Sequence, residues 1–117
     1  MPEKTFRRQA WEIEKIVPDM GSCMASDRIT VDGLQVGFMY RESPMDEIDT
    51  GWRLFSGDES DIYLKSSDNF EIYDINTVVN YYRDILDKLN CPIGSAFERN
   101  ADTGQFEEVR FIAPEEI

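Results

Sequence analysis

The stretch that most constrains the fold is residues 49–60, near the middle of the chain, where two aromatic side chains and a leucine lie between two glycines. Side chains alternate between the two faces of a strand. Trp52 and Leu54 would therefore share one face, and Arg53 and Phe55 would share the other. This alternation predicts a short strand that is covered on both faces.

An acidic cluster follows this strand at once. Gly57 ends the extended stretch, and the side-chain oxygen of Asp58 or Ser60 can accept hydrogen bonds from the unpaired amides at a helix start. We therefore expect a short helix over residues 59–64. A strand, a turn and a helix start of this kind commonly present polar groups at the edge of a protein.

The chain before the central strand opens with two predicted elements. Apolar residues at helical spacing within residues 6–17 predict an amphipathic helix that stops before Pro18. The small apolar residues of 21–26 favour a buried strand, against which another element could pack closely.

A hairpin is predicted next. Asp32-Gly33 lies between two alternating apolar runs, and this dipeptide suits a hairpin turn because both turn positions need a positive φ. The hairpin would span residues 29–40. The charged residues 41–49 would then form a loop that leads into the central strand.

Another strand and a longer helix are predicted after the central strand. Residues 70–75 alternate as a strand does, and the following apolar stripe predicts a helix that ends near residue 89. Asn76 or Thr77 would cap the start of this helix.

The last predicted element is a second hairpin, formed by residues 94–99 and 106–111 around a turn-rich connection. Strands and helices alternate without a regular βαβ rhythm, so the predicted class is α+β, a single domain with a mainly antiparallel sheet and two or three helices. We expect an N-terminal helical extension over residues 1–20, the domain over 21–112 and a loose tail over 113–117.

The charge of the chain limits its partners. The net charge is −12, which makes nucleic acid and anionic membranes poor partners. A basic protein surface, a cation or simple solubility remain open as reasons for that charge. No secretory signal or membrane span is visible, and the widely separated Cys23 and Cys91 are expected to be reduced thiols in a cytoplasmic protein.

The sequence gives little indication of a catalytic site. The chain has no histidine, the usual general base beside a serine or cysteine nucleophile. Asp58, Glu59 and Asp61 could serve a carboxylate-dependent hydrolase, although 24 acidic residues make such neighbours common by chance. Residues 100–104 depart from the order of a calcium loop and fit a hairpin turn better. We therefore expect no cofactor and no metal.

Acidic residues also stand on both sides of the central strand. They are Asp46, Glu47, Asp49, Asp58, Glu59 and Asp61. If both ends of the strand lie near one sheet edge, these carboxylates form a patch that attracts a basic partner. The alternative is an acidic surface spread over the whole domain.

Several blocks of this chain resemble a small bacterial family. The most specific are G-W-R-L-F-S-G-D-E at residues 51–59 and G-S-A-F-E-R at 94–99, with further similarity at residues 23–33, 36–42 and 72–77. The family was first described as a domain of unknown function and was later assigned to the immunity proteins of bacterial polymorphic toxin systems, as number thirty-three. The resemblance covers the chain from about Gly21 to Val109.

The resemblance implies an α+β cytoplasmic protein that neutralises a toxin by binding it, without enzymatic activity. It brings no established contact or catalytic residues. An acidic immunity protein suits a basic toxin, because complementary charge speeds encounter. The alternatives are a protein-binding module with no toxin partner and, third, the carboxylate-dependent hydrolase.

Our hypothesis from the sequence is therefore a non-catalytic, toxin-neutralising protein that meets its cognate toxin through an acidic edge. The predicted partner-binding residues are Asp49, Trp52, Arg53, Asp58, Glu59 and Asp61.

Overall fold

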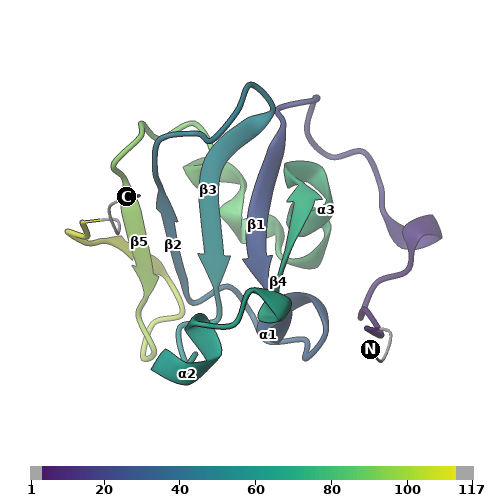
Figure 1. Ribbon diagram of the computed structural model, residues 1–117. Helices are drawn as coiled ribbons and strands as arrows, with labels where there is room; N and C mark the ends of the chain where they lie inside the picture. Colours follow the sequence, from purple (N-terminus) through teal and green to yellow (C-terminus); the bar gives the residue numbers. More distant parts are fainter. Residues whose placement is uncertain (1–3, 113–117) are drawn as a thin grey trace.

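A six-stranded sheet forms the body of the protein in the computed structural model, which describes residues 4–112. The strands are β1 (Ser22–Ser26), β2 (Phe38–Arg41), β3 (Asp49–Phe55), β4 (Phe70–Asp74), β5 (Ala96–Arg99) and β6 (Phe106–Glu108). Their order across the sheet is β4-β1-β3-β2-β5-β6 (Figure 1). Within residues 4–112, only β1 and β3 run parallel, and every other neighbouring pair is antiparallel. The predicted α+β class with a mainly antiparallel sheet is confirmed.

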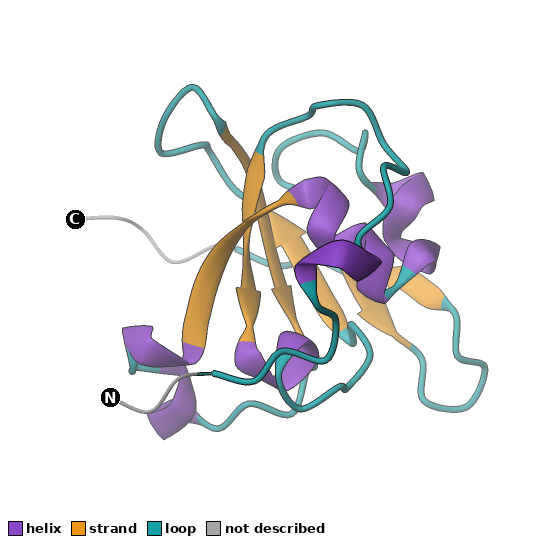
Figure 2. Cartoon of the chain, turned by 90° about the vertical axis from the view of Figure 1, so that its right-hand side faces the viewer, coloured by secondary structure: helices purple, strands orange, loops and turns teal. Residues whose placement is uncertain are grey.

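The helices are short. They are η1 (Ala10–Glu12), α1 (Asp27–Thr30), α2 (Asp61–Leu64), η2 (Ser67–Asn69), α3 (Ile75–Tyr81) and η3 (Arg83–Lys88), where η denotes a 3-10 helix. Figure 2 shows α3 and η3 along one side of the sheet, whereas α2 lies at the end of the strands. In the described part of the chain, one face of the sheet is therefore covered by helices and the other has no helical layer.

The core lies between the sheet and α3–η3. Trp52 and Leu54 of β3 are fully buried there, together with apolar side chains of the covering helices such as Val78, Ile85 and Leu89. The indole Nε1 of Trp52 donates a hydrogen bond of 3.0 Å to the Leu89 carbonyl, so its polar atom is satisfied inside the core. The alternation predicted for the central strand is confirmed.

Other predicted elements are confirmed as well. The strand expected over residues 21–26 is β1, and the strand expected over 70–75 is β4. Ser60 caps α2 by accepting a hydrogen bond of 3.1 Å from the Tyr63 amide. The second hairpin is present as the antiparallel pair β5–β6. The predicted tail over 113–117 lies outside the described residues.

The first predicted hairpin is wrong. Residues 27–30 form α1, capped by Ser26, and residues 34–37 are not in a strand. Gly33 does adopt a positive φ of 81°, but it does so at the end of a helix, where Leu34 N donates to the Arg28 carbonyl at 2.9 Å. Glycine is favoured in that left-handed position after a helix just as it is in a hairpin turn. The Asp32-Gly33 pair is therefore compatible with either a helix end or a hairpin.

The predicted N-terminal helix is also wrong, because the segment from Lys4 to Met20 contains a single 3-10 turn, η1. The rest runs along α3, where Asn76 Oδ1 accepts from the amides of Ile16 and Val17 at 2.7 and 3.1 Å. Asn80 holds the Glu14 amide in the same way. These side chains supply the hydrogen bonds that a helix would otherwise have made within itself.

The long helix expected up to residue 89 is interrupted. The cap predicted for its start is wrong, because α3 begins at Ile75 and Asp74 caps it by accepting from the Asn76 amide at 2.9 Å. Tyr82 is extended, with φ −143° and ψ 101°, and it separates α3 from η3. Its hydroxyl donates a hydrogen bond of 2.7 Å to the Gly33 carbonyl. Several β-branched residues weaken the helical preference of α3, and this tertiary contact favours the break.

A bulge in β3 sets the positions of the polar residues beside it. Between β1 and β3 the register advances from Ser22–Asp49 to Met24–Arg53, so β3 carries two extra residues. Gly51 lies at this irregularity with φ 89°, and a side chain there would collide with the Glu42 carbonyl. The amides of Gly51 and Trp52 donate to the side chains of Asp49 and Thr50 instead of to the ladder.

We expect Gly51→Ala to lower the free energy of unfolding more than Gly94→Ala does. Both glycines have a positive φ, 89° and 100°, but a Cβ at Gly94 meets no neighbour within 4 Å. Gly94→Ala should cost about 1–2 kcal/mol of backbone strain, and Gly51→Ala should cost that strain plus the displacement of Glu42. Urea unfolding of both variants measures the difference, and equal costs would show that the bulge tolerates a side chain.

Candidate functional site

The face of the sheet opposite α3 and η3, here called the open face, carries a cluster of aromatic rings. Phe38 lies directly across from Phe55, and their ring centroids are 6.1 Å apart. Tyr40 stacks on Phe55 at 5.9 Å with the planes 10° apart. Phe70 of β4 meets the edge of Phe55 at 5.9 Å. Phe111, from the segment after β6, packs on Tyr40 at 4.7 Å.

These rings form the floor of a groove of about 1380 Å³, here called the aromatic groove. Its apolar lining continues onto the sheet edge through Met24 and Ile72, which are cross-strand partners on β1 and β4. Ile72 is 66% exposed and Phe111 is 38% exposed. Phe38, Phe55 and Phe70 are half-buried and Tyr40 is buried. A partly exposed apolar groove of this kind marks an interaction site more often than a random position does.

Charged residues border the aromatic groove. The acidic ones are Asp58, Glu59, Glu71 and Glu98, and the basic ones are Lys65 and Arg99. Three of these groups are already paired: Arg99 with Asp84 at 2.7 Å, Asp58 with Arg28 at 2.6 Å and Glu71 with Lys4 at 2.9 Å. The rim groups without an ion pair within residues 4–112 are Glu59, Glu98 and Lys65, so acidic groups still predominate around the rim.

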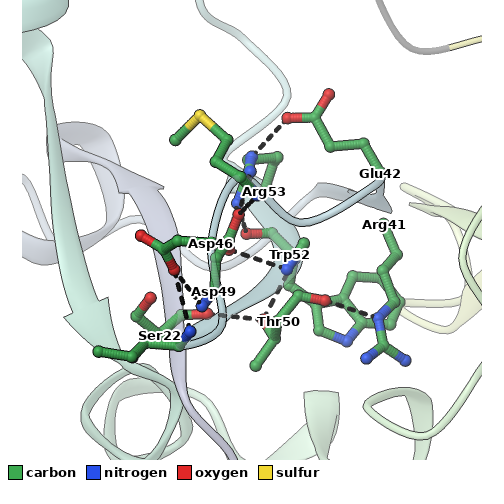
Figure 3. Close-up of polar contacts among 11 residues, drawn as sticks. Ser22, Arg41, Glu42, Asp46, Asp49, Thr50, Trp52 and Arg53 are labelled. Atoms are coloured by element: carbon green, nitrogen blue, oxygen red, sulfur yellow. Dashed lines mark hydrogen bonds and ion pairs between the residues drawn. The ribbon is translucent and has the colours of Figure 1, made fainter.

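The upper end of the open face is closed by an ion network around Arg53 (Figure 3). Its guanidinium donates two hydrogen bonds to Asp49, at 2.9 and 2.7 Å, and a third to Glu42 at 2.6 Å. The side chains of Arg53 and Asp49 are 2% and 6% exposed. A bidentate guanidinium–carboxylate pair is the arrangement in which a buried charge is best tolerated.

The same network orders the loop between β2 and β3. Asp49 also accepts from the Met45 amide at 2.9 Å, and Asp46 accepts from the amides of Ile48 and Asp49 at 3.0 and 2.8 Å. Hydrogen bonds from Arg53 hold the pKa of Asp49 well below its ordinary value, and Asp49 in turn raises the pKa of Arg53. The carboxylates at this end are therefore structural ligands of backbone and guanidinium groups.

The lower end of β3 carries a second, more exposed acidic group. Asp58 pairs with Arg28 at 2.6 Å and accepts from the Ser56 hydroxyl, and these bonds lower its pKa to about 2. Glu59 accepts from the amides of Ser56 and Gly57 at 2.8 and 2.9 Å. Asp61, at the start of α2, is exposed and makes no ion pair among residues 4–112.

The model of the Immunity protein Imm33 domain matches residues 23–110. The chain belongs to the Imm33 family. No curated protein and no solved structure matches it. The resemblance found in the sequence is thereby confirmed.

In this Imm33 protein, the acidic residues that were predicted to form one patch lie apart in the structure. The loop with Asp46, Glu47 and Asp49 lies at one end of β3, and the turn with Asp58, Glu59 and Asp61 lies at the other (Figure 1). A strand of seven residues spans about 20 Å. The two acidic groups therefore do not form one continuous patch.

The six residues predicted to bind a partner also differ in exposure. Trp52 is 0% exposed and belongs to the core, and Arg53 is enclosed by its own ion network. Asp58 and Asp61 are exposed, and Glu59 is half-buried. A direct contact surface can include the last three, whereas Trp52 and Arg53 can act only by holding β3 in place.

The aromatic groove of the Imm33 domain was not predicted from the sequence. The signal was present, because Phe38 and Tyr40 alternate on one strand and Phe70 and Ile72 alternate on another. The sequence did not show which face of the sheet the helices would leave uncovered. Within residues 4–112 there is also no cluster of three potential metal ligands and no helix long and apolar enough to cross a membrane.

We expect Arg53→Met to lower the free energy of unfolding by roughly 3 kcal/mol, because it leaves Asp49 and Glu42 enclosed without a cation. Arg28→Met is the control: it removes a pair of comparable geometry whose arginine side chain is 34% exposed, and it should cost much less. Urea unfolding at neutral pH measures both. Equal costs would mean that the Arg53 network contributes no more than a surface pair.

We expect Asp49 to make the stability of the protein fall in acid. The unfolded chain binds a proton at Asp49 near pH 3.8, whereas the folded protein binds it only at lower pH. The stabilisation is complete above pH 3.8, decreases below it and is lost as the pH falls through the lowered pKa. Asp49→Asn should therefore be less stable at pH 6 and should lose less stability between pH 5 and pH 3. A parallel decline of both proteins would exclude this role for Asp49.

Proposed function

We propose that this protein neutralises a toxin by binding to it and catalyses no reaction of its own. The observation that carries the proposal is the Imm33 family match over residues 23–110. The geometry agrees with a binding role, since two of the three carboxylates considered for catalysis are already bound: Asp58 pairs with Arg28, and Glu59 accepts from backbone amides. A cytoplasmic location remains a prediction of the same hypothesis.

The toxin we propose is basic, and the exposed acidic group at the lower end of β3 would attract it. A chain with a net charge of −12 raises the rate of encounter with a cationic surface. Asp58, Glu59 and Asp61 belong to this proposed surface. Asp49, Trp52 and Arg53 support it from within, because they fix the strand that leads to it.

A protection experiment tests the proposal. The probe is a toxin domain from the genome that encodes this protein, taken from a neighbouring gene where one is present and produced from an inducible plasmid. Cells that also make the Imm33 protein should survive induction, and the purified proteins should form a complex. Survival without complex formation, or death despite a folded Imm33 protein, would contradict neutralisation by binding.

We expect Asp61→Lys to slow association with that toxin by about three- to tenfold at low salt, with a smaller effect at high salt, because steering by charge is screened. Glu47→Lys is the matched control, since Glu47 is also exposed, lies at the other end of β3 and makes no ion pair within the described chain. Stopped-flow measurements give both association rates. If Glu47→Lys has the larger effect, the steering surface lies at the opposite end of the strand.

A further inference from the structure

The aromatic groove points to where the toxin is held, as distinct from how it is attracted. We propose that the groove binds a segment of the toxin that presents apolar side chains flanked by lysine or arginine. This inference rests on the proposed function. It adds the surface, which lies on the open face, and the chemistry of the element that occupies it.

The size of the groove favours a chain segment over a small molecule. Its volume of about 1380 Å³ exceeds the roughly 300–1,000 Å³ of most small-molecule sites. The floor consists of rings from three strands, Phe38, Phe55 and Phe70, and it extends to Ile72 at the sheet edge. Aromatic side chains of this kind supply much of the energy at protein interfaces.

The charge at the rim specifies a cationic occupant. Glu98 of β5 lines the groove, and its direct cross-strand partner on β6 is Glu107. Both are exposed, and neither makes an ion pair within residues 4–112. Like charges placed opposite each other destabilise a sheet. A lysine or arginine from a partner would remove this repulsion, whereas the free protein leaves it uncompensated.

The same charges disfavour another copy of this chain in the groove. A second copy would bring the same glutamates and a further net charge of −12 to the contact. Like-charge contacts of that kind suppress association. The lower acidic group also adjoins the groove, since Asp58 and Glu59 line it, so the steering surface leads directly to the proposed binding surface.

The first experiment tests the groove without the toxin. The probe is a short synthetic peptide of alternating leucine and lysine, and the control is a peptide of equal length with serine in place of leucine. In NMR titrations the leucine peptide should shift amide signals of β1–β4 on the open face, and the serine peptide should shift them far less. No shift, equal shifts from both peptides or shifts confined to α3 and η3 would overturn the inference.

The second experiment uses the toxin and two matched variants. Ile72→Lys places a charge in the groove, and Ile48→Lys makes the same change outside it, at a residue that is 69% exposed compared with 66% for Ile72. Ile72→Lys should raise the Kd by about tenfold or more, and Ile48→Lys should leave it nearly unchanged. Thermal unfolding of both variants verifies that they are folded.

The outcomes separate the two proposals. If the toxin binds both variants equally, the groove is the wrong surface while neutralisation by binding stands. If the unaltered protein fails to bind the toxin, the toxin is overturned as the occupant. If Ile72→Lys converts a dimer into a monomer, the occupant is a second copy and the inference is overturned.

A substitution at Glu98 should change the stability of the protein and its affinity for the toxin in opposite directions. Glu98→Gln should make the isolated protein more resistant to urea, because it relieves the repulsion with Glu107, and it should weaken toxin binding by about threefold. Glu47→Gln removes the same charge away from the groove and should change neither quantity appreciably. A Glu98→Gln variant that binds as tightly as the unaltered protein would contradict the assignment of a cationic partner group to this rim.

Discussion

The enclosed guanidinium of Arg53 is the interaction on which the layout of the open face depends. A charge shielded from water persists only where partners satisfy it, and Asp49 and Glu42 do so from the two ends of the β2–β3 loop. This pairing holds the loop at the upper end of β3. The same strand therefore has a closed polar end, followed by Phe55 in the groove. The closed polar end and the aromatic groove thus lie next to each other along the same strand.

Local patterns in the sequence predicted the structure correctly where only one local structure was compatible with them. The alternation around Trp52 required a strand with Trp52 and Leu54 on one face and Arg53 on the other, and Ser60 could cap only the helix that follows it. The Asp32-Gly33 signal failed because a left-handed glycine also ends helices. The N-terminal helix failed for a different reason: Asn76 and Asn80, more than 55 residues away, bind the backbone of that segment. No local pattern contains such a contact.

The candidate site was predictable in composition but not in arrangement. Acidic residues on both sides of β3 were visible in the sequence, yet their separation follows from the length of the strand, and the role of each depends on its neighbours. Asp49 and Asp58 are both paired with arginine, but one pair is enclosed and the other is exposed. Which face of the sheet lacks helices depends on how α3 and η3 pack, a property of the whole chain. The groove could be recognised only after that choice was known.

Two features of the open face are left unsatisfied in the isolated protein: apolar rings partly in contact with water and the Glu98–Glu107 pair. A basic, partly apolar partner would relieve both at once. Binding to the folded state alone would then stabilise the fold by mass action, in proportion to the logarithm of partner concentration relative to Kd. The Arg53 network is already satisfied in the free protein, so it need not rearrange when a partner binds. A frame that keeps its hydrogen bonds in both states would lose little entropy on association, and the favourable change would be concentrated in the groove.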